Sequence, residues 1–281
     1  MELPQNTNLP FFSYGIFKPG ELGFLRIKDY VLNQKKIILK GNLLLRDGLP
    51  IIDLDGDWEV KGHLLYFNEN SYETPYQRII EIEPEKHYRW GTVPIKGNKQ
   101  NEANILIGRS PNRGSVQSED KYFKGRRDPL FNEAFELIEQ IIDDKNYFTQ
   151  DYKDFFKLQM AYLLLWTIIE KYVSLRYHLG DRVNDKIHQL KTDQYFCSQL
   201  KINIKYKRNV FRADRPSDKE TLDPEKPNKC IDYYYQIRSN ITHRGKATHN
   251  DFEMLHLSAT ELCGIMKATI GNAFEESIVQ N

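Results

Sequence analysis

The first hundred residues alternate short apolar runs with turn residues. The run Phe11-Phe12-Ser13-Tyr14 ends at Gly15, and Gly41 precedes the run Asn42–Leu45. Short apolar runs separated by Gly, Pro, Asn and Asp indicate strands that are joined by turns. The strands we expect are Phe11–Tyr14, Lys36–Leu39, Asn42–Leu45, Val60–Phe67, Tyr88–Ile95 and Ala103–Ile107. This part of the chain is therefore predicted to be a small mixed β-barrel.

The apolar spacing becomes helical in the second half of the chain. The segment Tyr152–Tyr177 is apolar over much of its surface, which is expected of a central buried helix. Amphipathic helices are also predicted over Phe131–Ile142, Pro227–Arg244 and Asp251–Phe274. Gly245 is predicted to end the helix Pro227–Arg244, the third in chain order. The polar and basic segment Lys201–Asp223 is predicted to be a loop.

The two patterns meet in a polar stretch. Ser110–Asp128 is rich in turn residues and contains the basic run Lys124–Arg127, which is typical of a domain boundary. We therefore predict an α+β chain. It has a β domain over residues 1–112, a linker over residues 113–128 and an all-helical domain over residues 129–281.

Composition narrows the functional classes. The net charge of +1 gives no global basic field, so any nucleic-acid contact must come from a local patch. Three widely spaced cysteines form no CxxC pair and suit a reducing compartment. The N-terminus lacks the features of a signal peptide, and Met160–Ile169 is too short to span a bilayer. We expect a cytoplasmic protein without membrane contact.

A motif closes the third predicted helix. The segment Ile237–Gly245 contains Arg238 and, five positions later, His243. It resembles the Arg-x4-6-His motif of the HEPN superfamily, which comprises four-helix domains, many of them metal-independent ribonucleases. The resemblance implies a four-helix bundle, an RNA substrate, a homodimer and catalytic roles for Arg238 and His243. In the family an Asn often follows the arginine. Here Ser239 does, and Asn240 comes next as a further site candidate.

The chemistry of these residue types suits RNA cleavage. Histidine can accept or donate a proton near neutral pH, and arginine offers a permanent charge with forked donors to a phosphorane. An offset of five residues separates the two side chains by about 140° on an ideal helix, so one motif alone presents them poorly to one phosphate. In the family, a dimer places two motifs face to face across a cleft, so that side chains from both chains can reach one phosphate. The structural alternative is that both residues only cap carbonyls at the helix end.

A basic segment offers a candidate RNA surface. Cations beside aromatic rings are typical of single-strand binding, and here Tyr206 and Phe211 lie among lysines and arginines. The candidate RNA-binding residues are Lys205, Lys207, Arg208, Arg212 and Arg244. The alternative is a solvated loop whose charge is balanced by its own acids.

The N-terminal domain carries a second resemblance. The run Phe12–Glu21, the strand Val60–Tyr66 and the segment Glu83–Arg89 are similar to successive parts of the γ-glutamylcyclotransferase-like fold. The resemblance implies a ligand loop at Tyr14, Gly15, Ile16 and Phe17, with Glu83 as acid/base. Two residues depart from the family pattern, since Ile16 replaces a hydroxyl residue and Pro84 replaces a glycine. Glu81 and Glu85 compete with Glu83 for the assignment.

Taken together, the residues favour a metal-independent endoribonuclease that needs no cofactor. The N-terminal domain is then a sensor or regulatory domain with a small-molecule ligand, and a role as a toxin or antiphage defence effector follows by family analogy. One alternative is a γ-glutamylamine-type cyclotransferase with a helical dimerisation domain. Another is a non-catalytic RNA-binding or scaffold protein. His63 and His87 are interpreted as strand-face histidines rather than metal ligands.

Overall fold

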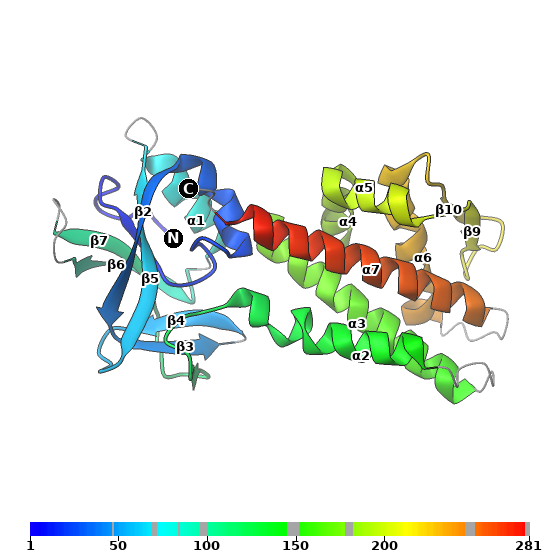
Figure 1. The fold of residues 1–281 in the computed structure, drawn as a ribbon, viewed down its shortest axis with the longest axis horizontal. Helices are drawn as coiled ribbons and strands as arrows, with labels where there is room; N and C mark the ends of the chain where they lie inside the picture. The colour runs from blue at the N-terminus through cyan, green and yellow to red at the C-terminus, as the bar shows by residue number, and fades with distance from the viewer. Residues whose placement is uncertain are drawn as a thin grey trace. The chain divides into compact units, whose positions relative to one another are not determined.

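The computed structural model describes residues 1–46, 48–68, 72–83, 85–95, 101–144, 152–177, 182–244 and 251–278. For residues 243 and 244 it describes the backbone alone. The chain forms two compact units (Figure 1), one of Met1–Asp128 with Ala273–Asn281 and one of Pro129–Asn272. Every helix within the described ranges is too short or too polar to span a bilayer.

A five-stranded mixed sheet forms the centre of the first unit. Its strands are β1 (Phe11–Ser13), β2 (Val31–Lys40), β5 (Glu59–Phe67), β6 (Tyr88–Pro94) and β7 (Glu102–Gly108), in the order β2-β5-β1-β7-β6. The central strand β1 pairs antiparallel with β5 and parallel with β7. Since β1 lies between β5 and β7, the loop that follows β1 starts in the middle of the unit.

A smaller sheet and one helix complete this unit. β3 (Asn42–Arg46) lies between β4 (Leu49–Asp53) and β8 (Val116–Gln117), and the helix is α1 (Glu73–Ile82). Strand β8 belongs to the segment predicted as a linker, so that segment is part of the first unit. The predicted barrel is wrong, because the described strands form two open sheets. Alternating apolar residues reveal that a strand is covered, but they do not distinguish a closed barrel from two sheets.

Both faces of the larger sheet are covered by apolar side chains. Phe11 and Leu65 belong to one buried cluster, whereas their neighbours Phe12 and Leu64 belong to another. This division follows from the period of two along a strand. Tyr76 of α1 joins the first cluster and is fully buried. The sheet can therefore hold polar groups away from water on either side.

The second unit is built around one long helix. α3 (Tyr152–Tyr177) contacts α2 (Glu133–Asp143), α4 (Val183–Thr192) and α6 (Pro227–Arg244), which explains why it is apolar on several sides. Tyr162, Leu165 and Trp166 of α3 are almost fully buried. The other helices are α5 (Gln194–Asn203) and α7 (Phe252–Glu276). The last residues of α7, from Ala273 onward, belong to the first unit.

The prediction of an all-helical four-helix domain is wrong in detail. Residues 129–272 contain six helices where the structure describes them, together with a hairpin of β9 (Arg208–Phe211) and β10 (Lys219–Leu222). The hairpin lies in the segment predicted as a loop. Each strand has four residues, and among them only Val210 and Leu222 are buried, so the polar sequence hides the alternation. Four short 3-10 helices lie at Leu22–Arg26, Lys28–Tyr30, Gly125–Arg127 and Pro129–Phe131.

Candidate functional site

Arg238 is held in a defined orientation on α6. Its Nη2 donates to Oε1 of Glu170 on α3 at 3.5 Å, and its guanidinium carbon lies 5.7 Å from the centre of the Tyr235 ring. The side chain is 21% exposed. Nε of Arg238 is buried and has no hydrogen-bond partner in the described part of the chain. A carboxylate and a ring thus fix the position of the guanidinium.

Glu170 is shared between two cations. Its Oε2 lies 4.0 Å from Nζ of Lys186 on α4, and Lys186 is 8% exposed as a residue. Arg238, Glu170 and Lys186 together carry a formal charge of +1. A cluster with one unbalanced positive charge, partly withdrawn from water, favours an anion.

Asn240 lies between Arg238 and His243 in the sequence of α6, and its side chain is buried. Its Oδ1 accepts hydrogen bonds from the backbone N–H of Ala213 at 3.0 Å and from Nε2 of Gln236 at 2.8 Å. Its Nδ2 donates to the carbonyl of Phe211 at 2.9 Å. The amide therefore attaches the hairpin to α6, and its contacts are those of a positioning residue.

His243 and Arg244 form the last backbone positions of α6. Their side chains, and Gly245, lie outside the described residues. The structure therefore shows that one helix carries Arg238 and His243, and it describes the surroundings of Arg238.

Four of the five basic residues predicted to bind RNA have partners within the second unit, and the side chain of the fifth, Arg244, lies outside the described residues. Arg208 makes two hydrogen bonds to the carboxylate of Glu261 and donates to the Tyr233 hydroxyl at 3.1 Å. The remaining pairs are Lys207 with Asp223 at 2.8 Å, Arg212 with Asp214 at 3.2 Å, and Lys205 with the carbonyl of Ile202 at 3.1 Å. Arg208 is thus a half-buried structural cation, whereas Lys205 and Lys207 remain at the surface beside the exposed Tyr206 ring.

The predicted ligand loop of the first unit is packed into its core. The Tyr14 hydroxyl donates to the carbonyl of Leu106 at 2.8 Å and accepts from the N–H of Ile52 at 3.2 Å. A Cβ on Gly15 would lie 2.7 Å from Cγ of Pro50, so the backbone needs glycine at this close approach. Ile16 and Phe17 are buried in the apolar cluster.

Glu83 directly follows α1 and is 8% exposed. Burial raises the pKa of its carboxyl to about 8. Burial, and then the charge of Glu83, raise the pKa of Tyr14 and of Tyr88, so the three groups lie in one electrostatic neighbourhood. Glu81 and Glu85, with side chains 52% and 67% exposed, are surface residues by contrast. Among the three competing carboxylates, Glu83 is the buried one.

The sequence did not reveal Glu170 and Lys186 as neighbours of Arg238. It also did not reveal Tyr88 as a neighbour of Glu83. A signal for Glu170 was present, because it directly follows the largely apolar stretch Leu163–Ile169 on a helix expected to be buried. A carboxylate in such a place requires a cation. Within the described ranges, no three His, Cys, Asp or Glu side chains gather in a way that could hold a metal ion. All three cysteines are free thiols.

Comparison with known proteins adds little to this picture. No family model matches the chain, and no curated protein matches it. One solved structure, an uncharacterised protein from Pyrococcus horikoshii, aligns with 40% of this chain and 89% of its own. It is 21% identical, with a TM-score of 0.31, and a likeness this weak carries no argument.

Proposed function

We propose that the chain is a HEPN-type endoribonuclease that cuts RNA without a metal ion, with Arg238 and His243 as the reacting side chains. The observation that supports this most is the arrangement around Arg238. Glu170 and Tyr235 orient the guanidinium, and Lys186 places a second cation on the same carboxylate. An oriented guanidinium suits a phosphate that gains negative charge as it is attacked.

The reaction needs one proton acceptor and one proton donor. The 2′-oxygen of the RNA passes its proton to a water molecule and attacks the adjacent phosphorus, and the bond from phosphorus to the 5′-oxygen breaks. The leaving 5′-oxygen takes up a proton, and a 2′,3′-cyclic phosphate remains. Arg238 stabilises the phosphorane. His243, in the last turn of α6, donates the proton, because a helix C-terminus favours imidazolium.

Removing either reacting side chain tests the proposal. Single-turnover cleavage of a labelled RNA in EDTA should fall by at least ~10²-fold in Arg238→Ala and in His243→Ala, the usual size of such contributions. Arg238→Lys should also lose activity, because lysine keeps the charge but not the forked donors. Lys229→Ala is the matched control, because it deletes an exposed charge that lies in the first turn of the same helix.

Circular dichroism should show that all four variants keep the helical content of the wild type. Cleavage at the wild-type rate by both Arg238→Ala and His243→Ala contradicts the proposal. So does a product that lacks 2′,3′-cyclic phosphate ends by mass spectrometry.

A dimer is part of this proposal, because five residues on one helix separate the two side chains by about 140°. Arg238→Ala and His243→Ala chains should each be inactive, yet after unfolding and refolding together they should regain cleavage through mixed dimers. Lack of recovery, with light scattering reporting a monomer, would rule out the composite site.

A second candidate function rests on Glu83 and concerns the first unit. A buried carboxyl whose pKa is about 8 is suited to move protons near neutral pH, as a cyclotransferase requires. Release of 5-oxoproline from γ-glutamyl amines should then fall at least ~10²-fold in Glu83→Gln and stay unchanged in Glu81→Gln. We place this function second, because Ile16 offers no hydroxyl and its side chain is packed in the core. Without 5-oxoproline release, the first unit is left as a sensor or regulatory domain.

A further inference from the structure

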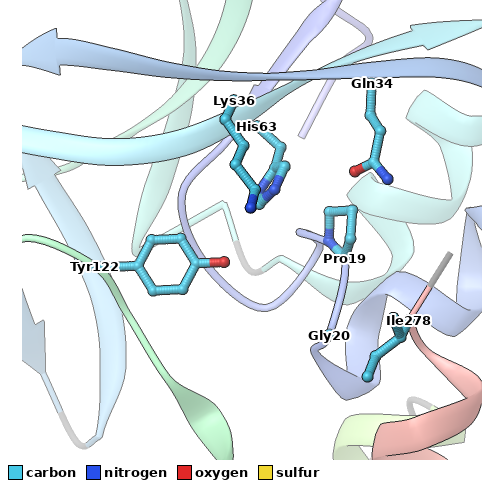
Figure 2. A pocket seen from close by; sticks show the side chains of 7 residues that line it. All are labelled: Pro19, Gly20, Gln34, Lys36, His63, Tyr122 and Ile278. Atoms are coloured by element: carbon cyan, nitrogen blue, oxygen red, sulfur yellow. The ribbon is translucent and has the colours of Figure 1, made fainter. Parts of the chain in front are cut away.

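A cavity of about 370 Å³ opens in the first unit beside the loop that follows β1. Figure 2 shows the residues that line it: Pro19, Gly20, Gln34, Lys36, His63, Tyr122 and Ile278. Gln34 and Lys36 come from β2 and His63 from the neighbouring β5, where Lys36 is the register partner of His63. Tyr14, Glu83 and Tyr88 are not among the lining residues, so this cavity is distinct from the Glu83 neighbourhood.

Two polar atoms in the wall have no partner among the described residues. Nδ1 of His63 is buried without a hydrogen bond, and the residue is 4% exposed. Oε1 of Gln34 is likewise buried without one. Buried polar atoms in folded proteins are nearly always satisfied by protein, water or ligand, because an unmade hydrogen bond costs about 1–3 kcal/mol. Both atoms belong to side chains that line one cavity, which points to a polar molecule bound there.

The charges around the cavity favour an anion. Nζ of Lys18 lies 2.6 Å from Glu21, so these two buried charges balance each other, and the same ammonium lies 4.1 Å from the centre of the Tyr122 ring. Lys36 has no ion-pair partner in the described part of the chain and supplies the unbalanced charge. Burial, and then the charges of Lys18 and Lys36, lower the pKa of His63 to about 4, so its ring is neutral at neutral pH.

Figure 2 shows the Tyr122 hydroxyl, the Lys36 side chain and the Gln34 amide directed toward the same space. Donors and a cation thus lie on one side, and the Gln34 carbonyl oxygen supplies an acceptor. The volume is near the lower end of the roughly 300–1,000 Å³ that is usual for small-molecule sites.

We propose that this cavity binds a small organic anion that also carries an N–H or O–H donor. Lys36 and the Tyr122 hydroxyl contact the anionic group, and Oε1 of Gln34 accepts from the ligand's donor. The buried imidazole of His63 completes the wall. The anion can be a phosphate ester or a carboxylate, and the two are separated by the choice of probe.

The test is calorimetric titration of the whole chain with AMP, L-malate and inorganic phosphate. AMP combines a phosphate ester with an amine, malate combines carboxylates with a hydroxyl, and phosphate alone lacks the organic part. We expect AMP or malate to bind with a Kd below about 1 mM. Lys36→Ala should weaken this binding about tenfold or more, and Gln34→Leu should weaken it as well.

Lys35→Ala is the matched control, because Lys35 is an exposed neighbour on the same strand whose side chain points to the opposite face. Binding should also move the NMR signals of the His63 ring. The proposal is overturned if neither organic probe binds. It is overturned equally if Lys35→Ala and Lys36→Ala weaken binding alike, or if the His63 signals do not move. The assay contains no RNA, so its failure leaves the proposed cleavage site untouched.

Discussion

Glu83 in the first unit and Glu261 in the second are both largely withdrawn from water, and the two units treat these glutamates in different ways. Glu83 in the first unit is 8% exposed, and the groups that share its surroundings are the neutral hydroxyls of Tyr14 and Tyr88. Glu261 of α7 in the second unit has an 11% exposed side chain, and Arg208 and Tyr234 lie beside it as donors. Glu261 accepts two hydrogen bonds from Arg208 and one from Tyr234.

Withdrawal from water therefore gives a neutral acid at Glu83 in one unit and an ion pair at Glu261 in the other. Without a cation, burial raises the pKa of a carboxyl into the neutral range, where it can exchange a proton. With a bidentate arginine, the carboxylate becomes a structural cross-link. The difference teaches that a cationic partner, rather than the extent of burial, decides the role of a buried acid. Without the cation the acid can exchange a proton, and with it the acid is a structural contact.

The largest expected effect comes from breaking the ion pair. Arg208→Ala leaves Glu261 buried without its cation, and such a change costs about 3–5 kcal/mol. Urea unfolding followed by the helical signal at 222 nm should shift to a lower midpoint by a corresponding amount. The double variant Arg208→Met with Glu261→Leu should recover most of the loss, because it removes both charges. A loss below about 1 kcal/mol in Arg208→Ala would show that solvent screens the pair.

The neutral acid should reveal itself through pH. Folded Glu83 keeps a proton up to about pH 8, whereas the unfolded chain releases it near the ordinary value of 4.5. Unfolding therefore releases a proton between these values. The contribution of Glu83 to stability is full below about pH 4.5 and falls by about 1.4 kcal/mol per pH unit up to pH 8.

Glu83→Gln should remove this slope and raise the unfolding free energy at pH 7 by about 3 kcal/mol. Urea titrations at pH 5, 6, 7 and 8 measure the unfolding free energy and its slope with pH, with Glu81→Gln as the exposed control. Parallel pH profiles for wild type and Glu83→Gln would mean that Glu83 is already ionised at neutral pH.

A smaller effect is expected from changing Glu170, whose carboxylate is shared by Arg238 and Lys186. Glu170→Gln keeps the shape but leaves Arg238 and Lys186 facing each other without a negative charge. We expect RNA cleavage to fall roughly 10- to 100-fold, since a misplaced group costs this much in rate. Glu170→Asp should retain more activity than Glu170→Gln, because it keeps the charge. The reverse order would place Glu170 outside the positioning of Arg238.

The smallest effect should come from the surface lysines of the hairpin region. Lys205→Ala with Lys207→Ala should change the unfolding free energy by less than about 1 kcal/mol, because the ion pair of Lys207 is exposed. The slope of RNA affinity against salt should become shallower by about 1.4, the value for two phosphate contacts with a single strand. An unchanged slope would mean that these lysines are solvated surface residues that do not contact RNA.

The sequence predicted α3 and α6 to their terminal residues, because long apolar spacing and flanking polar residues mark a buried helix. It missed α4 and the hairpin β9–β10, whose few buried side chains are surrounded by charges. Arg238 and Glu83 were predicted as site residues from local motifs. The pairing of Arg238 with Glu170 joins residues 68 positions apart, and no local pattern carries that information.

The division of the chain also has a consequence for the order of synthesis. The first unit includes Ala273–Asn281, where Ser277 accepts a hydrogen bond from the N–H of Gly20 at 3.0 Å and Glu276 lies 3.7 Å from Lys28. Roughly 150 residues separate Asp128 from these partners, and at about 5–20 residues per second a ribosome needs roughly 8–30 s to add them. The unit that begins the chain is therefore completed last, after the whole helical unit has left the ribosome.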